Sequence, residues 1–350
     1  MRGCSASELR LRSMLLLDGS EGEGGGQILR TALASSLLTG VPFRIERIRA
    51  ARSRPGLLPQ HLTAVSAAAE IAAAWTEGAM LGSETLSFEP GRVRAGNYHF
   101  AIGTAGSTGL VLQTVLVPLL TADGESQVVI EGGTHNEGAP PFEFLDLSFA
   151  PLLRRMGADL SLFLERPGFY PAGGGRIRAR VGNATWGCLE LLERGATRSV
   201  WARALVSRLP LSIADRELAV VKEELDWPEE CLTASAMDAD GPGNALILVA
   251  ESEHVTEVFT GFGRRGLPAE ELASQAVAKT RRYLDSGVAV SMHLADQLLV
   301  PLTQSRGGSF LTLEPSTHFT TNAGVIDRFF DMEISTRRIG EKVVIDCRVE

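Results

Sequence analysis

A helix–strand order that recurs along the chain is the feature that most restricts how this sequence can fold. A helix-like run at residues 28–40 leads into a strand-like run at 42–50, and a second helix and strand follow. The same order returns between residues 110 and 181, and again from residue 293 to the end. Such recurrence is typical of one building block used several times. We therefore expect an α/β (α+β) fold in which three repeated βαβαβ-type units form a large domain.

A stretch of about 100 residues separates the second unit from the third, which is long enough for a small domain of its own. It has its own alternation, with strand-like runs at 200–209 and 244–252 and helix-like runs at 214–225 and 269–284. We expect a large catalytic domain made of residues 14–184 and 286–350. The residues between them, 185–285, would form an inserted small α/β domain.

The charge balance limits the kind of nucleic-acid contact that this chain can make. The formal net charge is −8, whereas a general nucleic-acid binder has a basic surface. One basic cluster stands out, formed by Arg44, Arg47, Arg49, Arg52 and Arg54. It is either a solvated charged face or a short phosphate-binding segment. An RNA partner would therefore be held locally, near one end.

The composition is that of an ordinary globular protein, with 44% hydrophobic and 22% charged residues. The start of the chain has no signal-peptide core, and no apolar run reaches the ~20 residues needed to cross a membrane. The four cysteines lack zinc-ligand and redox spacing. We expect reduced thiols and a cytoplasmic location, with no membrane partner.

A glycine-rich loop at residues 18–27 lies between a predicted strand and a predicted helix. Glycines there let backbone amides approach an anion at the start of the helix. The loop does not end in Gly-Lys-Ser/Thr, so it is not a Walker P-loop. It contains Glu21 and Glu23, and a carboxylate beside phosphates is explained best by a divalent cation. The alternative is a tight turn whose acids cap the helix.

Several basic and polar residues follow the loop and could bind a terminal phosphate. They are Arg30, Arg49, Arg52, Arg54, Gln60 and His61. Guanidinium groups bind phosphate oxygens in pairs and stay charged. The spacing of these residues does not by itself show that they converge.

His318 follows Pro315 and Ser316 at a predicted strand-to-helix junction. An exposed imidazole near helix amides suits attack on a phosphate, although an ordinary surface histidine is the alternative. Asp296 and Gln297 could hydrogen-bond a ribose or a base, and Pro141 and Phe144 could cover a purine face. Here too an alternative remains open, in which Asp296 is an ordinary acid near a helix start and Pro141 an ordinary loop proline.

Taken together, these segments resemble the RNA 3'-terminal phosphate cyclases from about Met14 to the C-terminus. The resemblance rests on eight blocks in order: LDGSEGEGGGQILRTAL, IRAARSRPGLLPQHLTAV, FAIGTAGSTGLVLQTVL, GGTHNEGAPP, GFYPAGGG, DGPGN, ADQLLVPL and EPSTHFTTNAGVI. It implies three repeats of an α/β unit plus a small inserted domain. It also implies an ATP-consuming enzyme of the ligase class, which converts an RNA 3'-phosphate to a 2',3'-cyclic phosphate and releases AMP and pyrophosphate.

The resemblance also implies roles for individual residues. His318 matches the histidine that becomes adenylylated, and Glu23 matches a glutamate linked to a divalent metal (Mg or Mn). The expected phosphate-binding residues are Arg30, Arg49 and Arg52, with Gln60 and His61 as further pocket residues. The expected ATP contacts are Gln113, Pro141, Phe144, His293, Asp296 and Gln297. At His293 this chain departs from the tyrosine expected in the family.

Two other readings remain open at this point. A non-catalytic, cyclase-like ribosome-assembly factor would be expected to lose the nucleophile and the pocket arginines, which are present here. An enolpyruvyl transferase is also built from repeated α/β units. The segments around Glu23 and His318 do not fit it.

Overall fold

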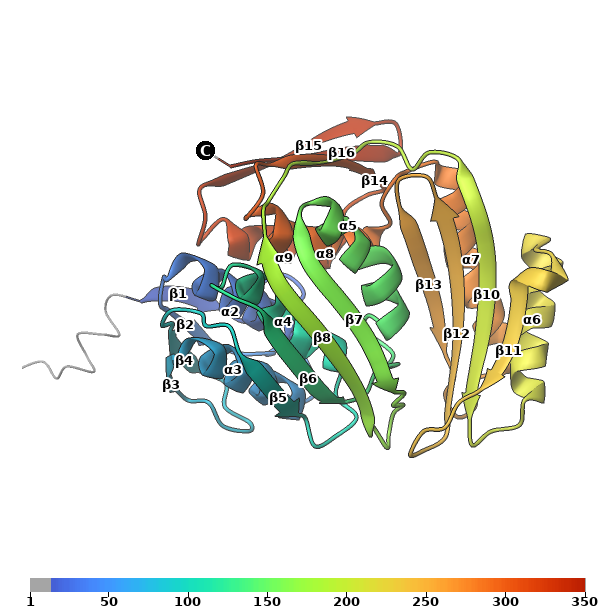
Figure 1. Cartoon of the computed structure of the whole chain (residues 1–350), viewed down its shortest axis with the longest axis horizontal. Coiled ribbons are helices and arrows are strands. Elements are labelled where there is room, and N and C mark those ends of the chain that lie inside the picture. The colour runs from blue at the N-terminus through green and yellow to red at the C-terminus, as the bar shows by residue number, and fades with distance from the viewer. Residues whose placement is uncertain (1–13, 350) are drawn as a thin grey trace, which may run out of the picture.

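The computed structural model describes residues 14–349, and its helices gather on the inner side of three sheets (Figure 1). Residues 1–13, which include Cys4, and residue 350 lie outside the described residues. The first unit runs through β1 (Leu15–Asp18), α2 (Gln27–Thr39), β2 (Phe43–Glu46), α3 (Pro59–Ala72), β3 (Trp75–Glu77) and β4 (Leu86–Glu89).

The second and third units repeat this order of elements. The second consists of β5 (Asn97–Ala101), α4 (Thr108–Leu120), β6 (Ser126–Gly132), the π-helical segment η1 (Phe144–Phe149), α5 (Ala150–Arg155), β7 (Ala158–Arg166) and β8 (Gly175–Ala184). The third consists of β9 (Leu189–Leu191), α8 (Met292–Leu302), β14 (Gly308–Thr312), α9 (Thr317–Ile326), β15 (Met332–Ile339) and β16 (Lys342–Val349).

The three units share one strand topology. The sheet orders are β1-β2-β4-β3, β5-β6-β8-β7 and β9-β14-β16-β15. In each sheet the first two strands are parallel and the other two pairings are antiparallel. The fold class and the threefold repeat expected from the sequence are therefore confirmed, and each unit ends in two antiparallel strands.

A fourth sheet stands at one side of the molecule, on the right in Figure 1. Its elements are β10 (Thr197–Ser207), α6 (Ser212–Leu225), η2 (Glu229–Cys231), β11 (Leu232–Ala236), β12 (Gly243–Ser252), β13 (Thr256–Phe262) and α7 (Ala269–Ser286). The strand order is β11-β10-β12-β13, so the first strand is central here. In the sequence, all of these elements lie between β9 and α8. We propose that they form the inserted domain, beginning after β9, because β9 pairs with β14 of the third unit.

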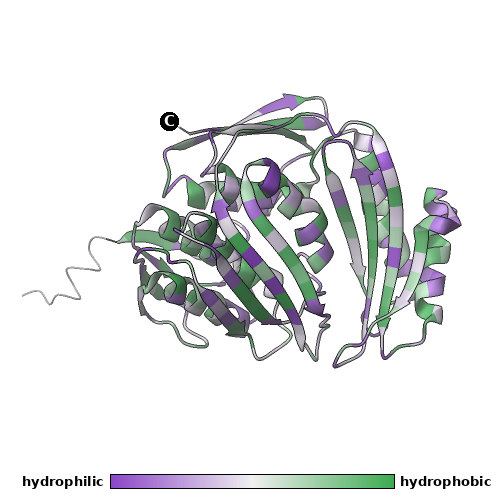
Figure 2. Cartoon of the chain, in the orientation of Figure 1, coloured by the Kyte–Doolittle hydropathy of each residue, from purple (hydrophilic) through white to green (hydrophobic). Residues whose placement is uncertain are grey.

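The fourth sheet is buried on both faces, and this ties it to the rest of the protein. Leu246 and Leu248 pack with α6 and α7 in one cluster, while Ala245, Ile247 and Val249 join the main core. Successive side chains of a β-strand point to opposite faces, which is why alternate residues of β12 enter different clusters. Along β7 and β8 the hydropathy alternates in the same way (Figure 2).

The starts of the inner helices position the site. Ser107, Ser291 and Ser316 cap α4, α8 and α9, and each hydroxyl accepts an amide hydrogen bond from the third residue on. Helix α2 is instead preceded by Gly26, which has no side chain to cap it, although the Gln27 N–H donates to Glu23 Oε1 over 3.4 Å. The next first-turn amides of α2, those of Ile28 and Leu29, are left for another partner.

Some local expectations needed correction. The strand predicted for residues 42–50 ends at Glu46, because Arg47 and Arg49 adopt left-handed backbone with φ of 55° and 57°. Strands β3, β5, β9, β11 and β13 were not predicted; all lie at a sheet edge, and four of them have five residues or fewer. Within residues 14–349, no helix is both long and apolar enough to cross a membrane.

Candidate active site

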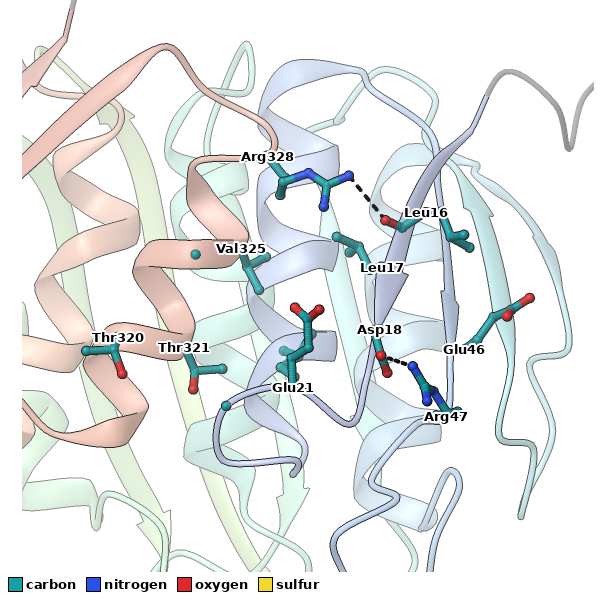
Figure 3. A pocket seen from close by; sticks show the side chains of 13 residues that line it. Leu16, Leu17, Asp18, Glu21, Glu46, Arg47, Thr320, Thr321, Val325 and Arg328 are labelled. Atoms are coloured by element: carbon teal, nitrogen blue, oxygen red, sulfur yellow. Dashed lines mark hydrogen bonds and ion pairs between the residues drawn. The ribbon is translucent and has the colours of Figure 1, made fainter.

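The glycine-rich loop is fastened to helix α9, nearly the whole chain length away. The backbone N–H of Glu23 donates to Thr321 Oγ1 over 3.1 Å. Gly22 has φ of 56°, and a Cβ there would overlap the Thr321 hydroxyl. Figure 3 shows Thr321 of α9 beside this loop. A glycine is therefore required where the loop meets α9, and the contact brings Glu23 close to the start of α9.

The carboxylate of Glu23 lies between two residues that were predicted for the site. It forms an ion pair with the Arg52 guanidinium, and its Oε2 lies 3.8 Å from His318 Nδ1. The Glu23 side chain is 7% exposed, whereas that of His318 is 49% exposed. A Cβ at Gly25 would overlap both the Glu23 carboxylate and Arg52. The loop thus places a shielded negative charge behind an accessible imidazole.

A second group of predicted residues meets at the start of α2. A Cβ at Gly26 would overlap His61 Nε2 and lie 2.9 Å from Arg30 Nη1, so these side chains reach the helix terminus. Burial, with the charges of Arg30 and Arg49, lowers the pKa of His61 to about 3. The imidazole is therefore neutral. Because its Nδ1 accepts the Leu58 N–H over 3.3 Å, its proton lies on Nε2.

Arg30 remains a cation in this setting. Desolvation lowers its pKa to about 10, and the nearby charge of Glu23 opposes this shift. Its Nη2 donates to Gln27 Oε1 over 2.5 Å, which orients the guanidinium. The amides of Ile28 and Leu29 at the start of α2, the His61 Nε2–H and the Arg30 guanidinium together form a set of donors suited to an anion.

A cavity of about 380 Å³ opens beside these donors. The residues predicted from the sequence that line it are Arg30, Pro141, Phe144, His293, Asp296, Gln297 and His318. Phe144 is the first residue of η1, and β13 and α7 of the fourth sheet supply the facing wall. The volume lies in the range of pockets that enclose a small organic ligand.

The buried carboxyl of Asp296 links α8 to the start of α9. Ser316 Oγ donates to Asp296 Oδ1 over 2.7 Å and also caps α9. Asn322 Nδ2 donates to the Asp296 backbone carbonyl and accepts a hydrogen bond from Thr31 of α2. Burial raises the pKa of Asp296 to about 7, although the Ser316 hydrogen bond opposes the shift. These hydrogen bonds fix α2, α8 and α9 relative to one another around His318.

His293 lies at the rim of the same cavity. Its ring is exposed to the cavity but surrounded by protein atoms. This desolvation, with the nearby Lys279 and His318, lowers the pKa of His293. The shift favours the neutral imidazole at the position where the resemblance led us to expect a tyrosine.

Six predicted residues do not line this cavity: Glu23, Arg52 and His61, described above, and Arg49, Gln113 and Gln60. Arg49 Nη1 donates to the carbonyls of Arg54 and Gly56 over 2.6 and 3.0 Å, so it shapes the segment that contains Arg52. Gln113 donates to Gln297 over 2.6 Å in a small neighbouring cavity. Gln60 accepts the Ser107 N–H over 2.6 Å and lines a third cavity.

Sequence reasoning missed several residues that complete the site. Gln27 and Thr321 lie inside motifs that were recognised, but their hydrogen bonds become visible only in three dimensions. Lys279 and Arg264 reach the cavity from the fourth sheet and have no local motif. A separate cavity of about 420 Å³ lies between β1 and α9, where Arg47 pairs with Asp18 and Arg328 contacts the Leu16 carbonyl (Figure 3).

A divalent cation would fit Glu23 only if the substrate supplied the other ligands. Among the described residues, no group of three or more histidine, cysteine, aspartate or glutamate side chains is arranged to hold a metal. Magnesium at phosphates is commonly bound by one or two carboxylates together with phosphate oxygens. The single shielded carboxylate of Glu23 suits that shared arrangement.

Comparison with known proteins identifies the class to which this fold and site belong. The family model described as RNA 3'-terminal phosphate cyclase matches residues 21–336. Proteins called RNA 3'-terminal phosphate cyclase from Ralstonia nicotianae and Ectopseudomonas mendocina are 50% and 51% identical over 335 and 334 residues. These matches cover 95% of this chain and 96% and 97% of the relatives. The chain therefore belongs to the RNA 3'-terminal phosphate cyclase family.

The solved structure of the enolpyruvyl transferase NikO from Streptomyces tendae is a far weaker likeness. It is 12% identical with a TM-score of 0.37, and the match covers 92% of this chain but only 46% of that one. Nothing about this chain is inferred from it.

Proposed function

We propose that this chain uses ATP to convert an RNA 3'-phosphate into a 2',3'-cyclic phosphate through a covalent histidine–AMP intermediate. The observation that supports this most directly is the position of His318. Its exposed imidazole stands at the start of α9, between the Glu23 carboxylate and the cavity lined by Arg30. Membership of the cyclase family supports the same reaction.

In the proposed first step, His318 attacks the α-phosphorus of ATP. Because Nδ1 faces Glu23, the nitrogen that attacks is Nε2 on the other side of the ring. The bond from phosphorus to the pyrophosphate oxygen breaks as the bond to nitrogen forms. The carboxylate of Glu23 offsets the positive charge that develops on the imidazole.

The cavity beside His318 would hold the nucleoside of ATP. Pro141 and Phe144 provide an apolar surface for the adenine, and Gln297, Asp296 and His293 provide polar groups for the ribose and base. Gln113 would act by fixing Gln297. A divalent cation shared by Glu23 and the phosphates would neutralise charge on the leaving pyrophosphate.

The second and third steps use the anion site at the start of α2. An oxygen of the RNA 3'-phosphate attacks the adenylyl phosphorus, and the electron pair of the broken bond returns to His318. The neighbouring ribose 2'-oxygen then attacks the activated 3'-phosphorus, AMP leaves, and the hydroxyl proton passes to solvent. Arg30, Arg52 and the shaping residue Arg49 would hold the two phosphates together, since cations offset their mutual repulsion.

We assign His61 and Gln60 to holding the RNA end rather than to proton transfer. A group with a pKa of about 3 is a poor general base near neutral pH. The Nε2–H of His61 can instead donate to a phosphate oxygen. The side-chain amide of Gln60 keeps its donors, since its oxygen accepts the Ser107 N–H.

A direct test supplies the purified chain with ATP, magnesium or manganese, and an RNA oligonucleotide ending in a 3'-phosphate. We expect the phosphate to become resistant to phosphatase and sensitive to mild acid, as a cyclic phosphate is. His318→Ala should abolish the product, whereas His99→Ala, at an exposed histidine on β5, should not. A folded wild-type chain that forms no product with either metal would favour the non-catalytic assembly-factor reading.

A further inference from the structure

A third cavity, of about 1040 Å³, lies between the second unit and the fourth sheet. It is far larger than the cavity of about 380 Å³ beside His318. The two cavities share wall residues that include Leu110, Glu137, Phe262 and Arg264. Gln60, assigned above to the RNA end, lines it too. The cavity thus reaches from Gln60, proposed to hold the RNA end, along the wall that it shares with the cavity beside His318.

Three segments with no part in the proposed chemistry line this cavity. They are residues 135–138, residues 169–171 and residues 242–244. Two of them contact each other, since the His135 and Phe169 rings stack at 5.2 Å and His135 pairs with Glu143 over 3.0 Å. Gly243 lies against Phe169 so closely that a Cβ there would overlap the ring. These contacts hold together one wall of the cavity, which is formed by segments that lie far apart in the sequence.

The groups at the surface of this cavity suit a single-stranded nucleic acid. Tyr170 is 77% exposed, directly after the buried Phe169. Arg265 is exposed in the loop after β13, beside Arg264, which pairs with Glu137 over 3.4 Å. The buried Oδ1 of Asn136 has no hydrogen-bond partner among the described residues. An exposed aromatic ring and nearby arginines are what stacked bases and backbone phosphates require.

We propose that this cavity, defined here as the strand groove, binds the single-stranded RNA segment that precedes the 3'-phosphate. A base stacks on Tyr170, and Arg265 contacts a backbone phosphate. This inference rests on the proposed function, because the groove is placed relative to the proposed phosphate site. It also explains how a chain with a net charge of −8 holds RNA, since the contacts are few and local.

The test measures binding of 5'-fluorescein oligouridylates with a 3'-phosphate, from a dinucleotide to a hexanucleotide, to the whole chain without ATP. Wild type should bind more tightly as the RNA lengthens. Tyr170→Ala should bind the longer RNAs roughly five- to 150-fold more weakly, the range expected for one lost stacked base. Tyr170→Phe keeps the ring and should retain the affinity.

The proposed contact between Arg265 and a backbone phosphate is tested by the salt dependence of binding. Arg265→Gln should lower the slope of log affinity against log salt by about 0.7, as expected for one lost phosphate contact on a single strand. Matched controls lie outside the groove: Phe163→Ala, at a 40% exposed ring on β7, and Arg306→Gln, at an exposed arginine. Both should bind like wild type.

The outcomes separate this inference from the proposed function. Equal affinity of Tyr170→Ala and wild type at every length would overturn the strand groove, whatever the enzyme does with ATP. Length-dependent binding that needs Tyr170, in a chain that ATP never labels, would support the groove and refute the proposed chemistry. A 4-thiouridine at the second-last position should crosslink to the segment around Tyr170; a crosslink confined to the cavity between β1 and α9 would place the strand there instead.

Discussion

Replacing Thr321 with valine tests how the glycine-rich loop is held against His318, the proposed nucleophile. Valine keeps the shape of threonine but removes the hydroxyl that accepts the Glu23 N–H over 3.1 Å. Thr321 is 8% exposed, so the amide would lose its partner in a place that water reaches poorly. An unsatisfied buried donor costs about 1–3 kcal/mol. That cost corresponds to a roughly 5- to 150-fold shift in the docking equilibrium of the loop.

The assay is the rate at which radiolabelled ATP labels the protein at low, subsaturating metal. Thr321→Val should slow this rate by a factor within that range, because Glu23 leaves His318 when the loop detaches. Thr321→Ser restores the hydroxyl and should label close to wild type. Thr320→Val removes a neighbouring exposed hydroxyl that bonds only within α9 and serves as the control. Labelling of Thr321→Val at the wild-type rate would refute the idea that this hydrogen bond positions Glu23.

Three further predictions concern the same site. Arg52→Gln should slow labelling strongly, because Glu23 loses its guanidinium partner, while Arg44→Gln on β2 should not; equal rates for both would contradict the proposed pairing. Gly26→Ala should abolish cyclisation in a folded protein, because a Cβ there would overlap His61, whereas Gly324→Ala, which has open space, should be active. The folded protein keeps the Asp296 proton up to about pH 7, while the unfolded chain releases it near pH 4, so unfolding becomes easier as pH rises between these values. Asp296→Asn should remove up to about 4 kcal/mol of this pH dependence of the free energy of unfolding, measured by thermal unfolding. Asp285→Asn, at the surface, should remove little. Identical pH dependence in Asp296→Asn and wild type would show that the raised pKa of Asp296 is wrong.

The repeated architecture could be predicted from the sequence because its signals are local. Helix α8 and strand β8 have hydrophobic patterns of the right period, and glycines mark most of the connections. Short edge strands such as β3 gave no comparable signal, since three residues are too few to show a period. The early end of β2 depends on left-handed backbone at Arg47 and Arg49, which nothing in their residue type predicts.

The residues of the site could be named from motifs, but their arrangement could not. The contact between Glu23 and Thr321 joins positions 298 residues apart, and periodicity does not report on such pairs. Lys279 and Arg264 reach the cavity beside His318 only because the fourth sheet packs against η1. The conformation of Arg49, which donates to its own loop, likewise follows from the fold of that segment.

The most direct test of the account is the mass of the intact protein after incubation with ATP and magnesium or manganese, followed by peptide mapping. The account predicts a gain of one adenylyl group, on the peptide that contains His318, and its loss in His318→Ala but not in His99→Ala. An adenylyl group on any other residue, or a wild-type protein that stays unmodified while correctly folded and saturated with ATP, would contradict the assignment of His318 as the nucleophile.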